Sequence, residues 1–180
     1  MKRFLAFLVV LAGCVKIDPE GYKVYKIKAG DHKSTWKYVT TKKDTLEFKV
    51  LFDSSAVYNT IDPINQPDVN KLFGVSDCGE DHLEYSIRIG WRWYKDSLEL
   101  LWFKHESGEF TFGTIKKIDM DVVHNCTIKI QESNYIIKVD GVLVSLTRSC
   151  CEDYKRYYLY PYFGGSEKAP HDITIKIKEK

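Results

Sequence analysis

Several features that would point to a particular class of protein are missing from this chain of 180 residues. It contains no internal repeat and no Gly-rich linker, and beyond residue 13 it has no apolar run long enough to span a bilayer. No cysteines follow the CxxC spacing that is typical of zinc sites. No stretch has the apolar periodicity of an amphipathic helix. These absences argue against a repeat protein, a zinc protein and a helical domain.

The chain also lacks an excess of charge of either sign. It carries 27 Lys and Arg residues against 25 Asp and Glu residues. Residues 1–13 hold two of the basic residues and no acidic one, so 25 basic residues (27 minus 2) face 25 acidic ones in the remainder. Binding to nucleic acid depends on a surplus of positive charge. We therefore expect no nucleic-acid partner.

The N-terminal stretch "MKRFLAFLVVLAGC" has the features of a secretion signal. Lys2 and Arg3 precede an apolar core, and small residues stand before Cys14. The ending "LAGC" resembles the bacterial lipoprotein box, and this resemblance implies cleavage before a lipid-bearing Cys14. We interpret residues 1–13 as a signal peptide and residues 14–20 as a lipidated tether. An ordinary signal peptide with a chance cysteine is the alternative.

A lipid at Cys14 would make the membrane a partner of the protein, because acyl chains contribute about 0.8 kcal/mol per buried methylene group. The expected location is the bacterial cell envelope, at the outer membrane or the cell surface. Four further cysteines follow: Cys78, Cys126, Cys150 and Cys151. A secreted chain can form disulfides. We predict one bridge from the adjacent pair, 150–151, to Cys78 or Cys126, with free buried thiols as the alternative.

Alternation of apolar and polar residues dominates the rest of the chain. Runs of this kind occupy residues 46–52, 126–131, 135–139, 142–146, 157–163 and 172–178. Asp140-Gly141 predicts a hairpin, because a tight turn needs a positive φ. Residues 53–80 are expected to form a long irregular loop. About nine or ten short strands predict an antiparallel two-sheet sandwich, formed as a single domain by residues 21–180.

The stretch "LEYSIRIGWRWY" shows which side chains of one strand face the core. With a period of two, Trp91 and Trp93 share an apolar face with Leu83, Tyr85, Ile87 and Ile89. We predict that the two tryptophans are core residues; a platform for sugar binding is the alternative, and a bulge at Gly90 would reverse their direction. Arg88 and Arg92 lie on the opposite face.

A second strand, "YYLYPYF", supplies candidate partners for these arginines. With Leu159 and Phe163 facing the core, the outward side chains are those of Tyr158, Tyr160 and Tyr162. Tyrosine rings stack on sugars, and the guanidinium fork of arginine matches a carboxylate or sulfate. We predict that Arg88, Arg92, Tyr158, Tyr160 and Tyr162 line one ligand-binding groove. A solvated sheet face with incidental tyrosines is the alternative.

The run "NYIIKVDGVLVSL…YYLYPYFGGSEKAPHDITIKIKE" resembles the closing strands of concanavalin A-like lectin/glucanase jelly rolls. It is especially similar to small secreted or lipid-anchored Bacteroidetes proteins that end in "YPYFGG…APHDI". The stretch "NKLFGVSDCGEDHLEYSIRIGWRW" is similar to the middle of the same group. The resemblance covers residues 68–180 and implies an all-β, antiparallel jelly-roll sandwich that binds or cleaves glycans. Function itself depends on the site.

Three functions follow from these observations. The expected one is a lipid-anchored, non-catalytic protein that binds a polysaccharide or oligosaccharide. The first alternative is a lyase that cleaves uronate-containing glycans by β-elimination, with His82, Arg88, Tyr160 and His171 as catalytic candidates. Retaining hydrolysis is disfavoured, because the chain lacks an ExDxE-type set of carboxylates. The second alternative is a structural or protein-interaction lipoprotein.

No cofactor or metal is assigned. Many jelly rolls bind a structural calcium ion, and Asp77, Glu80, Asp81 and Asp172 offer oxygen ligands. No loop, however, has the regular ligand spacing of an EF-hand.

Overall fold

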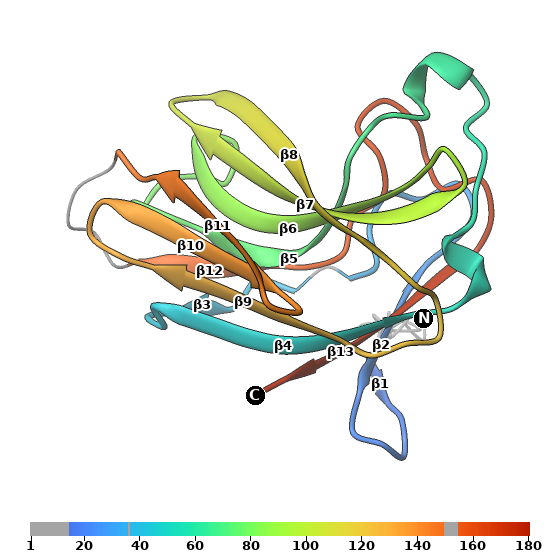
Figure 1. The fold of residues 1–180 in the computed structure, drawn as a ribbon, viewed down its shortest axis with the longest axis horizontal. Coiled ribbons are helices and arrows are strands. Elements are labelled where there is room, and N and C mark those ends of the chain that lie inside the picture. The colour runs from blue at the N-terminus through green and yellow to red at the C-terminus, as the bar shows by residue number, and fades with distance from the viewer. Residues whose placement is uncertain (1–14, 36, 150–154) are drawn as a thin grey trace, which may run out of the picture.

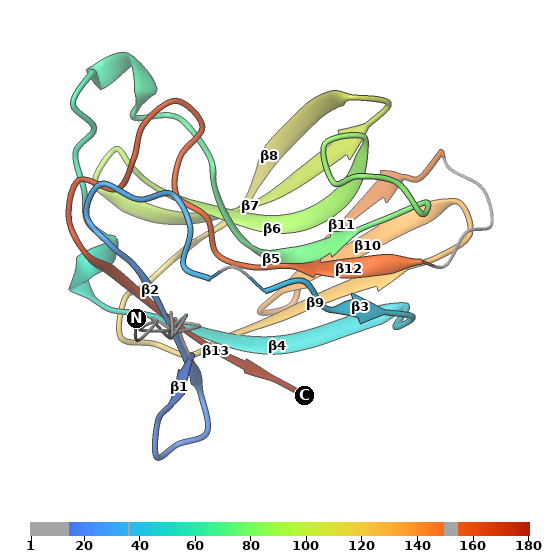
Figure 2. The same cartoon turned by 180° about the vertical axis from the view of Figure 1, so that it is seen from behind.

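The computed structural model describes residues 15–35, 37–149 and 155–180. Within them the chain forms two packed antiparallel sheets, which appear as two layers in Figures 1 and 2. The first has the order β1 (Lys16–Ile17), β2 (Lys23–Ile27), β13 (Ile173–Glu179), β4 (Thr45–Phe52), β9 (His124–Ile130), β10 (Asn134–Val139) and β11 (Val142–Thr147). The second has the order β3 (Thr40–Thr41), β12 (Arg156–Leu159), β5 (Asn70–Ser76), β6 (Tyr85–Tyr94), β7 (Ser97–Glu106) and β8 (Glu109–Ile118). Two 3₁₀ turns, η1 (Ser54–Ala56) and η2 (Pro63–Asn65), precede β5.

The core lies between the sheets and follows from the alternation of side chains. In β6, Ile87, Ile89 and Trp91 are fully buried and belong to the main apolar cluster. The Trp91 ring packs 5.3 Å from the ring of Phe52, which comes from the opposite sheet. Trp93 is partly buried against the same cluster. The prediction that the tryptophans are core residues is confirmed for Trp91 and in part for Trp93, which lies at the margin of the core. The strand continues unbroken through Gly90, and the register shift lies instead in β5.

Three sequence-based expectations about strand boundaries are wrong. The predicted loop at residues 53–80 contains β5, a strand with neighbours on both sides. Its sequence "NKLFGVS" is buried on both faces and therefore lacks the alternation that marks a half-exposed strand. The predicted strand at 157–163 ends at Leu159. The sequence predicts that Leu83 shares the core face of β6. It is instead exposed and lies before the strand, which begins at Tyr85.

A buried ionic cluster fixes the loop that follows β5. Asp77 is fully buried, and its carboxylate accepts hydrogen bonds from Arg148 Nε at 2.6 Å, Arg156 Nε at 2.8 Å and the Tyr135 hydroxyl at 2.7 Å. Burial alone would raise the pKa of Asp77, but these bonds hold it below its ordinary value. The cluster joins both sheets and anchors the chain just before His82.

The structure defines the state of two of the five cysteines. Cys78 takes part in a disulfide, whereas Cys126 is a free buried thiol. The sequence predicts a disulfide to either Cys78 or Cys126, and the structure shows that Cys78 is the disulfide-bonded one. Residues 150–151 and the predicted lipidation site, Cys14, lie outside the described residues.

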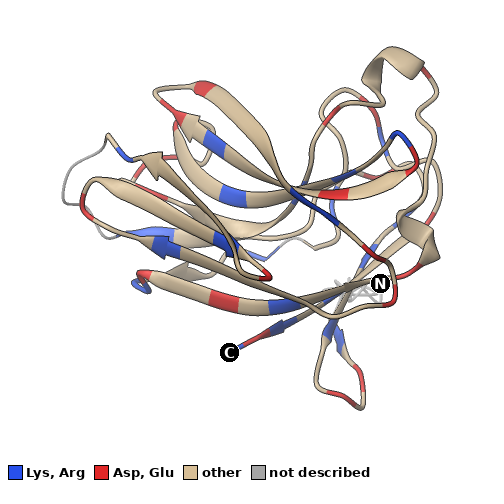
Figure 3. Ribbon diagram, in the orientation of Figure 1, with Lys and Arg blue, Asp and Glu red and all other residues tan. Residues whose placement is uncertain are grey.

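Charges of both signs are interspersed over both sheets (Figure 3). Within the described residues, no helix is long and apolar enough to cross a membrane. Nor do three or more His, Cys, Asp or Glu side chains of this part of the chain gather as a metal site would require. Of the calcium ligands considered above, Asp77 is bonded to arginines, and Asp172 pairs with Lys26 and Lys28.

Candidate functional site

A groove of about 690 Å³ lies on the face of the six-stranded sheet that is turned away from the core. Strands β5 to β8 form its floor, and the loops after β5 and β12 form its walls. Its lining includes three cations, Lys33, Lys71 and Arg88, and among the described lining residues only Asp68 carries a carboxylate. The groove is therefore positively charged although the chain as a whole is close to neutral.

Arg88 projects from the middle of β6 into the groove, because its neighbours Ile87 and Ile89 face the core. Gly74 makes room for it on the adjacent strand. The two residues are paired in register, and a Cβ atom at Gly74 would lie 2.8 Å from Arg88 Cγ and 2.2 Å from the Ile87 carbonyl oxygen. Only glycine allows the arginine stem to lie this close to β5.

The guanidinium group of Arg88 is buried without a carboxylate partner among the described residues. The residue is 6% exposed, and its Nε has no hydrogen-bond partner there. Nη2 donates to His105 Nδ1 over 3.4 Å, and the guanidinium carbon lies 5.4 Å from the Phe103 ring centre. Burial lowers the pKa of Arg88 to about 10, so the group remains cationic at neutral pH. A buried cation in this state favours an anionic ligand.

His105, on β7, is neutral in this environment. Burial and the positive charge of Arg88 lower the pKa of His105 to about 4. Because Arg88 can only donate, Nδ1 of His105 is the acceptor and the ring proton is on Nε2. Ser86 Oγ lies 3.3 Å from the same Nδ1 and donates to the His82 carbonyl oxygen. The imidazole is thus held in one orientation against the arginine.

His82 and Tyr157 form a second polar pair on the wall of the groove. The Tyr157 hydroxyl lies 3.0 Å from His82 Nδ1 and accepts a hydrogen bond from the His82 backbone N–H. It also donates to Asp81 Oδ2 at 3.3 Å. Burial and the charge of Arg88 lower the pKa of His82, whereas burial raises the pKa of Tyr157. At neutral pH both groups are uncharged and joined through one hydrogen bond.

Lys71 is the second cation near the centre of the groove. Its Nζ donates to the Gly164 carbonyl oxygen at 3.0 Å and lies 4.7 Å from the Phe103 ring centre. Burial and the charge of Arg88 lower the pKa of Lys71 to about 8. Tyr162 pairs with Lys71 through backbone hydrogen bonds and stacks on His32. Lys71 is therefore mostly protonated at pH 7, but its pKa lies only about one pH unit higher.

A ladder of three phenylalanine rings extends the groove toward β8. Phe103 stacks on Phe110 at 5.5 Å, and Phe110 lies 6.4 Å from Phe112, with all three rings nearly parallel. Phe110 is 56% exposed and Phe112 42% exposed. Exposed aromatic faces of this kind can stack on the C–H face of a sugar ring.

The structure brings together three of the residues predicted from the sequence. Arg88, Tyr162 and His82 line the groove. Arg92 does not: its guanidinium group donates to Glu99 Oε2 and to the Pro67 carbonyl oxygen, both at 2.8 Å.

The predicted outward direction of Tyr158 and Tyr160 is wrong. Both rings pack against the core, where Tyr158 stacks on Phe73 and Tyr160 lies 5.9 Å from Tyr25. An aromatic ring can enter the core while its hydroxyl stays at the edge, so tyrosine does not mark the solvent side. His171 lies away from the groove and donates from Nε2 to the Ser55 carbonyl oxygen.

Lys71, His105, Tyr157 and the phenylalanine ladder were not predicted from the sequence. For part of this set a signal was present. Ser107-Gly108 forms a turn, and the hairpin it closes pairs Phe103 with Phe112 and His105 with Phe110. The same alternation that places Arg88 outward could have placed these side chains on the same face.

Comparison with known proteins supports the fold. No protein-family model and no curated protein sequence matches the chain. Among solved structures, the alginate lyase AlyC3 is similar with a TM-score of 0.63 and 13% identity, over 95% of this chain and 79% of its own. The PL7 alginate lyase AlyA1 from Zobellia galactanivorans is similar with a TM-score of 0.56 and 12% identity, over 91% and 78%.

The endo-β-1,3(4)-glucanase SCLam of family GH16 is similar with a TM-score of 0.55 and 8% identity, over 88% of this chain and 70% of its own. At these identities the likeness concerns the fold alone. It confirms the prediction from the sequence: the chain is an all-β, antiparallel jelly-roll sandwich of the concanavalin A-like type, the fold that alginate lyases and family 16 glucanases share.

Proposed function

We propose that the groove binds a uronate-containing polysaccharide, with a sugar carboxylate bonded to Arg88. The observation that carries this proposal is the buried guanidinium group, which has an unpartnered Nε and no carboxylate partner among the described residues. A carboxylate placed against it would supply the missing charge and hydrogen-bond acceptors.

The surroundings of Arg88 support an anionic sugar rather than a simple anion. Lys71 adds a second positive charge, while Phe110 and Phe112 present ring faces next to it. A neutral polysaccharide would leave the guanidinium group unpaired, which disfavours it in this groove. The neighbours include alginate lyases, one of them solved with dimannuronate, and this makes mannuronate oligomers the first ligands to test.

The test is titration calorimetry with mannuronate and guluronate oligomers, and with a neutral β-glucan oligomer of the same length. Wild-type protein is expected to bind at least one uronate series and not the glucan. Arg88→Met should abolish this binding. Lys129→Met, which removes an exposed charge from the other sheet, is the matched control and should bind normally. Equal binding of glucan and uronate would refute the proposal.

A second candidate function is β-elimination at the same site. The observation that favours it is the position of neutral proton-exchanging groups near Arg88: His105 at 3.4 Å, and His82 with its Tyr157 partner on the wall. In β-elimination a base removes the C5 proton, the C4–O bond breaks, and the leaving oxygen receives a proton. Neutralisation of the carboxylate by Arg88 would make the C5 proton more acidic.

The two candidates are separated by ultraviolet absorbance, because elimination creates an unsaturated uronate end. A steady rise with wild-type protein, lost in His82→Asn or Tyr157→Phe while binding persists, would support a lyase. Binding without any rise would identify a non-catalytic binding protein. Neither binding nor a rise across alginate, pectate and glucuronan would exclude both and favour a structural or protein-interaction role.

We also propose that the protein is held at the bacterial cell envelope by a lipid on Cys14. The proposal rests on the "LAGC" ending of the apolar N-terminal stretch. Expression in a bacterium with radiolabelled palmitate should label the wild-type chain in the membrane fraction. If Cys14→Ser is labelled and fractionated like the wild type, this anchor is refuted.

A further inference from the structure

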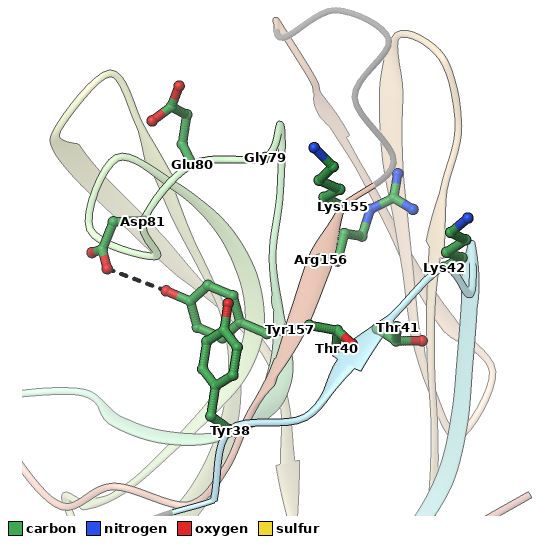
Figure 4. A pocket seen from close by; sticks show the side chains of 10 residues that line it. All are labelled: Tyr38, Thr40, Thr41, Lys42, Gly79, Glu80, Asp81, Lys155, Arg156 and Tyr157. Atoms are coloured by element: carbon green, nitrogen blue, oxygen red, sulfur yellow. Dashed lines mark hydrogen bonds between the residues drawn. The ribbon is translucent and has the colours of Figure 1, made fainter.

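A second cavity, of about 650 Å³, lies beside the groove at the opposite side from the phenylalanine ladder. Figure 4 shows its residues: Tyr38 and Tyr157 lie at its base, Lys42 on one wall, and Glu80 and Asp81 on the other. Its volume falls within the range of about 300–1,000 Å³ that is typical of ligand sites. A ligand bound to Arg88 in the groove alone would leave this cavity empty.

Tyr38 gives the second cavity a surface suited to a sugar ring. It is 71% exposed, and its ring centre lies 4.7 Å from that of Tyr157 at an angle of 35°. The contact with Tyr157 supports the ring from one side while most of its surface stays accessible. An exposed aromatic face of this kind can stack on a sugar ring, and the same cavity is lined by Thr40, Thr41 and Lys42, which offer hydroxyl and amine groups.

The two cavities meet at a hydrogen-bonded pair of side chains. Tyr157 lines the second cavity, His82 lines the groove, and the Tyr157 hydroxyl joins them at 3.0 Å. Asp81 also lines the second cavity and is the chain neighbour of His82. A ligand that reaches past this pair would occupy both cavities.

The order of strands places aromatic residues at both ends of this path. Phe110 and Phe112 belong to β8, at one edge of the six-stranded sheet, whereas Tyr38 lies two residues before β3, at the other edge. Arg88, on β6, lies between them. The path therefore crosses the strands, with a positively charged centre and an aromatic surface at each end.

We propose that the second cavity is the continuation of the groove and receives further sugars of the same uronate polysaccharide. The sugar that follows the Arg88-bound unit passes the His82–Tyr157 pair, and a later one stacks on Tyr38 with its carboxylate toward Lys42. This inference rests on the proposed function, since it assumes that a uronate chain occupies the groove.

The experiment measures affinity against ligand length. Uronate oligomers of two to eight sugars, from the series that binds, are titrated into the wild-type protein and into Tyr38→Ala, Tyr38→Phe and Lys42→Glu. Affinity of the wild type is expected to rise with length. Tyr38→Ala should lose about three- to tenfold for the long oligomers, as expected for one ring contact, and less than twofold for the dimer. Lys42→Glu should show the same dependence on length, and Tyr38→Phe should bind like the wild type.

The matched control is Tyr94→Ala, which removes a tyrosine from the β6–β7 hairpin outside both cavities. It should bind oligomers of every length like the wild type. If dimers bind but Tyr38→Ala has no effect on long oligomers, the second cavity is not a continuation of the groove and the proposed function stands. An equal loss for dimers and long oligomers would also overturn the inference, because Tyr38 would then act through Tyr157 on the groove. If no oligomer binds, the proposed function itself fails.

Discussion

Replacement of Arg88 by methionine should abolish ligand binding without loss of stability, and this combination separates a binding residue from a structural one. Methionine keeps an unbranched stem over Gly74 and removes only the charged end. A structural arginine would behave differently, because removal of one partner of a buried ion pair costs about 3–5 kcal/mol of stability.

The expected change in stability follows from the contacts of the guanidinium group. A buried donor without a partner, as at Nε, costs about 1–3 kcal/mol, and the substitution removes this cost. The lost cation–π contact with Phe103 amounts to about 0.5–1 kcal/mol. The free energy of unfolding should therefore stay constant or rise by up to about 2 kcal/mol, equivalent to an increase of a few degrees in Tm, at roughly 2–4 °C per kcal/mol for a chain of this size.

The expected loss of binding is larger. Removal of one member of a buried charge pair across an interface costs about 2–5 kcal/mol, which corresponds to a roughly 30- to 4,000-fold loss of affinity. Urea denaturation and titration calorimetry on the same protein samples measure both quantities. Arg88→Lys should be intermediate in binding, because it keeps the charge but not the fork. A variant Arg88→Met that is destabilised by more than about 1 kcal/mol, or that binds normally, would refute the reasoning.

Three further predictions concern Lys71 and Gly74, beside Arg88, and the separate buried cluster at Asp77. Affinity for uronate should fall between about pH 7 and 9, because the protonated Lys71 binds the anion and its pKa in the free protein is about 8; in Lys71→Arg, titration calorimetry should show no such fall. Gly74→Ala should destabilise the fold by about 1–3 kcal/mol in urea denaturation and weaken binding, since its Cβ would displace the arginine stem; an unchanged midpoint would contradict this. Asp77→Asn should cost about 3–5 kcal/mol in the same assay, because Arg148 and Arg156 would lose a buried carboxylate; a loss below about 1 kcal/mol would show that the cluster is replaceable.

The sequence predicts well those features that depend on one strand alone. In β6 the period of two places Trp91 inside and Arg88 outside, as observed, because every second residue is apolar over the whole strand. The same reasoning fails after Arg156. There the rings of Tyr158 and Tyr160 pack against the core, whereas Leu159 is buried outside the main apolar cluster. Whether a single residue is apolar therefore does not show which way its side chain points in this segment.

Features that depend on which strands are neighbours are harder to predict. β5 is buried on both faces and has no alternation, so its place next to β6 cannot be recognised, and Lys71 and Gly74 are lost with it. His105 is easier to place, because β6 and β7 are consecutive strands that pair directly and put it on the same face as Arg88. The buried cation is thus predictable from its strand, whereas Tyr157 and Tyr162 reach the site only because β12 and the segment after it pair with β5, far away in the sequence.

The order of the six-stranded sheet sets an expected length for the proposed polysaccharide ligand. Neighbouring strands lie about 4.8 Å apart, so the five intervals from β3 to β8 span about 24 Å. This spacing is comparable to the length of one pyranose unit, so a chain that crosses the strands advances by about one sugar per strand. The number of strands therefore sets the number of sugars that can contact the sheet. Oligomers longer than the width of the sheet would project beyond both edges and gain no further contacts, so selection for a minimum chain length would be built into the architecture itself.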